Sequence, residues 1–190
     1  SSTRRVAMPP TAPSSSIRNG RSCGHSDAIS CNASHSELTL AALVGDLIEL
    51  SRVQRDEPTS RPTDIDVDAV VTTALDDVQL LAQAKQIEIV VGGTGKLRMP
   101  GNFEQIASAV RNLLLNAIHY SHPGTRVAVG TKLVDDFIEI SVVDQGIGIA
   151  KADQERIFER FYRVDPARSR LTGGTGLGLS IVKHVCASHG

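Results

Sequence analysis

Two glycine clusters near the carboxyl end of the sequence constrain the fold most. The first, Asp144-Gln-Gly-Ile-Gly148, follows a predicted strand, and the second, Gly173-Gly-Thr-Gly-Leu-Gly178, opens a predicted helix. Between the clusters lie five arginines, Arg156, Arg160, Arg163, Arg168 and Arg170. Glycine lets backbone approach a ligand closely, and a cationic flap between two such places suits a polyphosphate.

The strand before the first cluster is expected over residues 137–144. Its alternation puts Ile138, Ile140, Val142 and Asp144 on one face, so that a carboxylate ends an apolar, core-facing row. An ionised carboxylate is costly to bury unless hydrogen-bond donors satisfy it. Asp144 therefore either accepts from nearby backbone amides or meets a ligand donor such as an exocyclic amine, and a plain turn is an equal alternative for this motif alone.

The strongest helix signal follows Asn102, a good N-cap. The apolar residues of this helix form one continuous stripe: Phe103, Ile106, Ala107, Val110, Leu113, Leu114, Ala117 and Ile118. On the opposite face, one turn apart, stand Asn112 and Asn116. Their amide oxygens suit a hydrated Mg²⁺ shared with phosphates, although asparagines are also common on a solvated helix face.

Short strands and helices fill the remainder of residues 63–190. Strands are expected at 64–67, 86–91, 97–99 and 126–133, and helices at 68–84 and 177–188. A turn at Asp135-Asp136 joins the strand at 126–133 to the strand at 137–144. The Gly92-Gly-Thr-Gly95 run is expected to be a hairpin turn, because it opens no helix. The helix at 177–188 presents its amino end to phosphate. Ile157, Phe158 and Phe161 are expected to clip the flap onto the domain.

The amino-terminal part has a different character. Residues 1–36 are rich in Ser, Pro, Arg and Asn, lack periodicity, and are predicted to be a disordered tail. Residues 37–55 carry leucines at helical spacing, which indicates either the end of a longer helical hairpin or dimer stem, or an ordinary packed amphipathic helix. Residues 56–62 are polar, contain Pro58 and read as a linker.

Composition removes several classes of function. A net charge of -1, with 3% aromatic residues and no Trp, gives no reason to expect nucleic-acid binding. There is no run of eighteen apolar residues and no apolar signal segment at the start. The odd count of three cysteines, without a C-x-x-C, argues for a reducing compartment and free thiols. The chain is expected to be cytoplasmic.

The order of the motifs is more specific than any one of them. Asn112-x-x-x-Asn116 is followed by Asp144-x-Gly-x-Gly148, Phe158-Glu-Arg-Phe-Tyr-Arg163 and Gly174-x-Gly-x-Gly178. This order closely resembles the N, G1, F and G2 boxes of the ATP-binding domain of sensor histidine kinases, in the superfamily shared with gyrase, the Hsp90 chaperones and MutL. The likeness runs from about residue 63 to residue 190.

The resemblance implies an α+β fold of the Bergerat type, which is a two-layer α/β sandwich with helices on one face of a mixed sheet. Residues 63–190 would be this ATP-binding domain without its last strands, and residues 37–55 the end of the dimerisation and phosphotransfer hairpin. The implied cofactors are ATP and Mg²⁺. The implied ATP-binding residues are Asn112, Asn116, Tyr120, Asp144, Gly146, Gly148, Arg163, Gly174, Thr175, Gly176, Leu177 and Gly178.

Within that set the resemblance also implies roles. Asn116 would be the Mg²⁺ ligand, and Asp144 would accept from the adenine amino group. Tyr120 would line the base, while Arg163 and the amides of residues 174–178 would hold the triphosphate. His119 stands where the family often has a lysine, which removes one expected phosphate contact.

The implied function is that of a sensor histidine kinase in a two-component phosphorelay. The γ-phosphoryl group of Mg-ATP passes to a histidine of a homodimeric stem and then to an aspartate in the receiver domain of a response regulator. Membrane attachment would come through a sensor region preceding this chain.

The phosphoacceptor itself is expected to be absent from this chain. The acceptor box of the family is imitated by Ser34-His-Ser-Glu-Leu38, but a serine separates His35 from the glutamate and no helical hairpin fits between this segment and residue 54. A gyrase-like or Hsp90-like ATPase is disfavoured, because those relatives carry a glutamate base where Asn112 stands. A noncatalytic nucleotide-binding or kinase-interacting module is the alternative.

Overall fold

The computed structural model describes residues 44, 45, 51, 63–93, 95–165 and 174–189. The expected tail and linker, and most of the expected stem helix at 37–55, lie outside these residues. The elements, in chain order, are β1 (Thr63–Asp66), α2 (Val67–Ala84), β2 (Glu88–Gly93), β3 (Arg98–Gly101), α3 (Phe103–Tyr120), β4 (Arg126–Val134), β5 (Phe137–Asp144), the 3-10 helix η1 (Arg156–Phe158) and α5 (Gly178–Ser188).

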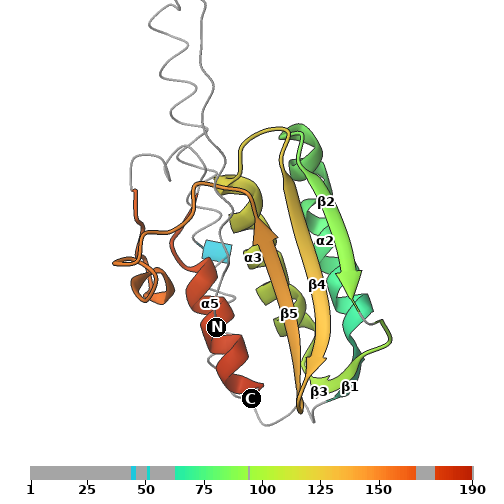
Figure 1. Ribbon diagram of the computed structural model, residues 1–190. Coiled ribbons are helices and arrows are strands. Elements are labelled where there is room, and N and C mark those ends of the chain that lie inside the picture. The colour runs from blue at the N-terminus through green and yellow to red at the C-terminus, as the bar shows by residue number, and fades with distance from the viewer. Residues whose placement is uncertain (1–43, 46–50, 52–62, 94, 166–173, 190) are drawn as a thin grey trace, which may run out of the picture. The chain divides into compact units, whose positions relative to one another are not determined.

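The main sheet is mixed and has three strands in the order β2-β4-β5. β2 runs parallel to β4, and β4 runs antiparallel to β5 in a register that pairs Val127 with Asp144 and Val134 with Phe137. Figure 1 shows α2, α3 and α5 together on one face of this sheet. The predicted two-layer α/β arrangement is therefore confirmed, as is the hairpin turned at Asp135, which adopts a φ of 53°.

A second, smaller sheet corrects one expectation. The Gly92–Gly95 run is not a hairpin turn, because β2 pairs with β4 while β3 pairs with β1, from Thr63↔Gly101 to Asp66↔Arg98. Gly92 and Gly93 belong to β2 itself. A two-strand hairpin would have left β1 without a partner, whereas the crossing to β1 satisfies the backbone of both short strands.

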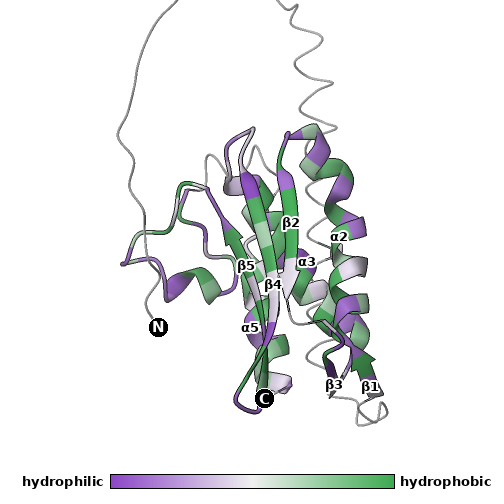
Figure 2. Ribbon diagram, turned by 45° about the vertical axis from the view of Figure 1, so that its right-hand side comes forward, coloured by the Kyte–Doolittle hydropathy of each residue, from purple (hydrophilic) through white to green (hydrophobic). Residues whose placement is uncertain are grey.

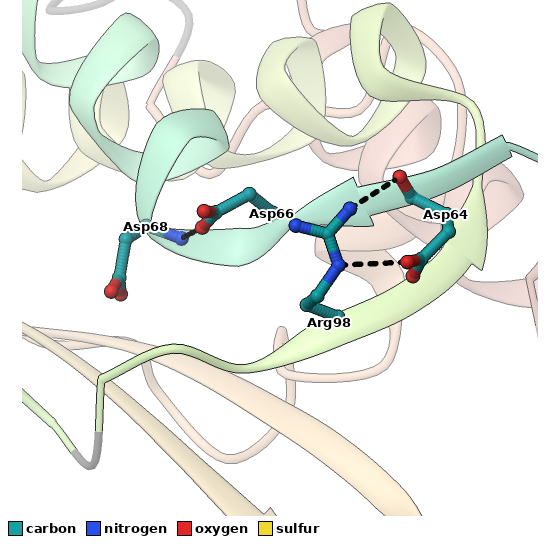
Figure 3. Close-up of polar contacts among 4 residues, drawn as sticks. All are labelled: Asp64, Asp66, Asp68 and Arg98. Carbon is teal, nitrogen blue, oxygen red and sulfur yellow. Dashed lines mark hydrogen bonds and ion pairs between the residues drawn. The ribbon is translucent and has the colours of Figure 1, made fainter.

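Polar contacts join the two strands of the small sheet and cap the start of α2 (Figure 3). Arg98 donates from Nε to Oδ2 of Asp64 at 2.7 Å and from Nη2 to the Asp64 carbonyl at 3.0 Å. Asp66 is the N-cap of α2, since its Oδ1 accepts from the amide of Asp68 at 2.9 Å. The carboxylate thus satisfies a helix amide that has no partner within the helix.

The core lies between the sheet and the three helices. Helix α3 supplies much of it, and six of the eight residues in its predicted apolar stripe are buried; Phe103 and Leu113 are half-buried. The inward-facing residues of β4 alternate with exposed ones along the strand, as a half-covered sheet requires. In Figure 2 the strands of the main sheet are mostly hydrophobic, whereas α2 alternates between hydrophobic and hydrophilic residues.

We expect Leu114→Ala to lower the free energy of unfolding by about 2–5 kcal/mol, because it opens a cavity among packed side chains. Leu114 is 0% exposed in the middle of α3. Leu80→Ala in α2 is the matched control, since Leu80 is 80% exposed and its loss should change stability by less than about 0.5 kcal/mol. Urea denaturation followed by circular dichroism measures both, and equal effects would contradict this assignment of the core.

Candidate functional site

Four segments with predicted site residues meet at one end of the main sheet. They are the carboxyl end of β5, the last turn of α3, the amino end of α5 and the loop that carries η1 (Figure 1). Backbone contacts connect them: Ile147 N donates to the Tyr120 carbonyl at 3.3 Å, and Phe161 N donates to the Gly176 carbonyl at 2.9 Å. Residues that are distant in sequence are thereby brought into one site.

Asp144 ends β5 and is exposed, so its carboxylate has no burial to offset. Its Oδ1 accepts from the amide of Gly146 at 2.7 Å. Among the described residues, no hydrogen bond engages the other carboxylate oxygen. The local-amide alternative from the sequence is therefore confirmed, whereas the expectation that Asp144 faces the core is wrong, because the residue is exposed. Acceptance from a ligand by the second oxygen stays a prediction.

Gly146 is required by the close approach of α3. An added Cβ at Gly146 would lie 2.5 Å from the Tyr120 carbonyl oxygen, a distance at which something must shift. Gly148 has a different reason, since nothing lies within 4 Å of its Cβ position but its φ is +69°, which side chains disfavour. The loop after Asp144 is thus fitted against the end of α3.

Asn112 is not on a solvated helix face, which corrects the placement expected for it. The residue is 9% exposed, and its Nδ2 donates to the Ser108 carbonyl at 3.0 Å. Its Oδ1 lies 2.8 Å from where a Cβ of Gly178 would be. The amphipathic pattern could not reveal this contact, because α5 covers a second face of α3.

Asn116 lies one turn further along α3 and is half-buried. Among the described residues its carboxamide has no hydrogen-bond partner. Its side-chain oxygen can therefore coordinate a cation, whereas in Asn112 the Nδ2 donates to the Ser108 carbonyl and the Oδ1 faces Gly178 of α5. The two amides, equivalent in the sequence pattern, have different surroundings in the fold.

The second glycine cluster supports both the backbone of the loop and the start of α5. Gly176 has a φ of +77°, and its added Cβ would lie 2.9 Å from backbone atoms of Phe161. The amide of Leu177 donates to Thr175 Oγ1 at 3.2 Å, and the Leu177 side chain is fully buried in the core. Any contact between Leu177 and a nucleotide would therefore involve backbone atoms.

Phe161 does not clip the loop onto the domain as expected. It is 56% exposed and has a φ of +63°, while Ile157 and Phe158 are half-buried. Its amide, rather than its ring, makes the attachment, through the bond to Gly176. The sequence suggests an apolar anchor here because ring hydrophobicity is visible in it and backbone conformation is not.

Tyr162 organises the loop instead, through contacts that the sequence pattern did not indicate. Its hydroxyl donates to Asp153 Oδ1 at 2.6 Å, and the Arg156 guanidinium lies 4.2 Å from its ring centroid. The hydrogen bond to Asp153 raises the pKa of Tyr162, so the phenol stays protonated and continues to donate. This pair holds the residues around η1.

Arg163 follows Tyr162 and places a half-buried guanidinium in the loop that carries η1. Its Nε and Nη2 atoms are buried and have no hydrogen-bond partner among the described residues. A guanidinium cannot shed its charge, so such burial is costly without an anion. A phosphate oxygen is the partner that its planar fork fits.

These residues fit Mg²⁺ when a nucleotide accompanies it. The described residues contain no group of three or more His, Cys, Asp or Glu side chains that could hold a metal ion. Mg²⁺ commonly keeps several waters and takes one or two protein ligands together with substrate phosphates, and the Asn116 oxygen can be such a ligand. In the described part of the chain, no helix is both long and apolar enough to cross a bilayer.

Comparison with known proteins agrees with this arrangement. Residues 101–190 match the family described as histidine kinase-, DNA gyrase B-, and HSP90-like ATPase. The sensor-like histidine kinase SenX3 of Mycolicibacterium smegmatis is 49% identical over 150 residues, which are 79% of this chain and 39% of that kinase. The chain thus spans less than half the length of this curated relative.

Solved structures show the same relationship. The mycobacterial sensor histidine kinase MprB is 34% identical with a TM-score of 0.59, over 67% of this chain and 80% of that one. The Acinetobacter baumannii histidine kinase AdeS is 26% identical with a TM-score of 0.61, over 78% of this chain and 67% of that one. The chain therefore belongs to the histidine kinase-, DNA gyrase B-, and HSP90-like ATPase family, among its sensor histidine kinases.

Proposed function

We propose that this chain is the ATP-binding catalytic region of a two-component sensor histidine kinase. In the intact protein it transfers the γ-phosphoryl group of Mg-ATP to a histidine on a dimeric helical stem. A response-regulator aspartate then receives the phosphoryl group. One observation supports this most: α3 contacts both the Asp144–Gly148 loop, through Tyr120, and the amino end of α5, through Asn112.

The two contacts of α3 correspond to two binding regions, one for the adenine and one for the phosphates of a nucleotide. The unengaged oxygen of Asp144 accepts the adenine amino group, and Gly146 and Gly148 let the base lie against backbone. Tyr120 lines the base. At the other end, the orphan guanidinium of Arg163 and the backbone around Gly174, Thr175, Gly176, Leu177 and Gly178 hold the phosphates.

Mg²⁺, when bound, neutralises the charge that spreads over the phosphate oxygens during transfer. Asn116 supplies an oxygen ligand to it. Phosphoryl transfer requires positioning and charge neutralisation more than covalent help from the protein. The chain's own residues therefore bind and orient the donor, while the nucleophile is the histidine of the stem.

Hydrolysis of ATP by water is less well supported. Attack by water needs a base, and the residue that stands in the expected position is Asn112. An amide is not basic, and the Nδ2 of Asn112 is already engaged by the Ser108 carbonyl. The surroundings of Asn112 thus favour transfer to a stronger nucleophile such as histidine.

The wider context follows from the relatives. SenX3 and MprB are named as sensor histidine kinases, and SenX3 is more than twice the length of the part that this chain covers. We infer that the domain works in the cytoplasm, as part of a homodimer that recognises a receiver domain. A preceding sensor region would attach the intact protein to the membrane.

Asp144→Asn should weaken ATP binding by about 1.5–3 kcal/mol, which is about ten- to a hundredfold in affinity, since it removes a charged hydrogen-bond acceptor. Asp136→Asn, at the opposite end of β5, is the matched control and should bind like the wild type. Titration calorimetry with Mg-ATP measures both. Wild-type affinity in Asp144→Asn would remove the adenine-recognition role.

Mg-ATP should slow hydrogen exchange across residues 145–175, and Mg-ADP should slow it less, because phosphates give Arg163 and the backbone before α5 their partners. Exchange in β2, at the far edge of the sheet, should not change. Mass spectrometry of peptic fragments measures this. Equal protection by adenosine alone would show that phosphate does not organise the loop.

Labelled ATP should leave no acid-labile phosphate on this chain, since the Ser34-His35-Ser sequence departs from the acceptor box. A complete acceptor hairpin from a related kinase, added in trans, should become labelled, and its His→Gln version should not. Phosphohistidine mapped to His35 would contradict the first expectation. A chain that binds ATP but labels no hairpin would instead be the noncatalytic module.

A further inference from the structure

The last turn of α3 has carbonyl groups that no helical amide can reach, as every helix does. The Ala117 carbonyl accepts from the Ser121 amide at 3.1 Å, and the Tyr120 carbonyl accepts from Ile147 N at 3.3 Å. The two between them, on Ile118 and His119, both accept from the ammonium group of Lys85, each at 2.6 Å. The last four carbonyl groups of α3 thus each have a hydrogen-bond donor.

Lys85 is itself held in place. It is the C-cap of α2, and its amide donates to the Leu81 carbonyl at 3.1 Å. The next residue, Gln86, has a φ of +57° and accepts from the Gly124 amide at 2.9 Å. The end of α2 is therefore bound to the segment that follows α3 through the residue next to Lys85.

The charge of Lys85 suits this place as well as its hydrogen bonds do. The carboxyl end of a helix carries partial negative charge, and a cation there is stabilising. A lysine ammonium has three donors, so two carbonyls can be bound at once. Hydrogen bonds from a charged group are stronger than those between neutral groups.

The end of α3 is in direct contact with the predicted adenine loop, residues 144–148. The Tyr120 carbonyl both accepts from Ile147 and lies where a Cβ on Gly146 would collide with it. A small movement of the last turn of α3 would therefore move or release the loop that follows Asp144. The position of the helix end sets the position of the loop.

We propose that Lys85 is a positioning residue for the nucleotide site: by binding the Ile118 and His119 carbonyls it fixes the Tyr120 carbonyl, and through Ile147 the Asp144–Gly148 loop. The effect on nucleotide rests on the proposed function, whereas the effect on the loop does not. Lys85 itself touches neither adenine nor phosphate in this role.

The protonation state of His119, whose carbonyl accepts from Lys85, is compatible with an ammonium group at this helix end. Burial lowers the pKa of His119, and the charge of Lys85 lowers it further. The imidazole therefore remains neutral near pH 7, so a second positive charge does not oppose Lys85 at the helix end.

The test replaces Lys85 with methionine, which keeps an unbranched side chain and removes the donors and charge. Lys132→Met is the control, since Lys132 makes an exposed ion pair with Glu139 at 3.1 Å on the sheet. Circular dichroism verifies that each variant is folded. Amide exchange at Ile147 by NMR, without nucleotide, then measures the loop, and calorimetry measures ADP and ATP binding.

In Lys85→Met we expect amide exchange at Ile147 to become about tenfold faster, because the helix end loses the hydrogen bonds that the charged ammonium group donates to it. The affinities for ADP and for ATP should both fall, each by about three- to thirtyfold, because the two nucleotides share the adenine end. Lys85→Arg keeps the charge and donors and should restore most of both, and the His119 pKa should rise in Lys85→Met alone.

Unchanged exchange at Ile147 in a folded Lys85→Met protein would overturn the proposal. Failure of Lys85→Arg to restore the loop would overturn it too, since a lost charge or donor would then not be the cause. If Lys85→Met does not fold, Lys85→Gln, which removes the charge and keeps neutral amide donors, tests the charge, and unchanged exchange at Ile147 in it would overturn the role of the charge. A response at Ile147 in a protein whose wild type binds no ATP would support the positioning role and reject the proposed function.

Discussion

The arrangement depends on how closely α5 can approach α3. At the crossing, the Asn112 carboxamide lies where a side chain on Gly178 would begin, so the two helices meet backbone against amide. Leu177 and Ile181, fully buried beside this contact, secure the start of α5 in the core. This contact sets the distance between the amino end of α5 and α3. It therefore also positions the backbone before α5, which is expected to bind phosphate.

Much of the fold could be predicted from the sequence because its signals are periodic. The stripe of α3, the bounds of β5 and the Asn102 cap each depend on local spacing, and the structure bears them out. The core-facing row predicted along β5 holds only in part, because Asp144 at its end is exposed. The Gly92–Gly95 error arose differently, because a glycine run indicates a break in a strand without identifying the partner strand. Strand pairing is a long-range choice, and β2 paired with β4 across thirty-odd intervening residues.

The sequence predicted which segments carry the candidate site, but not the surroundings of each side chain in it. Motif order predicted Asp144, Asn116 and Arg163 as site residues, but a pattern cannot show which carboxamide has a hydrogen-bond partner within the fold. Lys85 gave no signal of its own, because a lysine after a helix is an ordinary solvated residue until another helix ends beside it. Residues of the same type therefore differ in role through the contacts between secondary-structure elements.

Phe161 has a consequence for how such a loop can open. A non-glycine residue in the left-handed region costs about 1–2 kcal/mol, which is similar to the net value of the single backbone hydrogen bond that holds it to Gly176. Attachment and backbone penalty therefore nearly cancel at this point. By these two contributions alone, release of the Phe161 amide from Gly176 changes the free energy little, so this hydrogen bond does not by itself keep the loop against the start of α5.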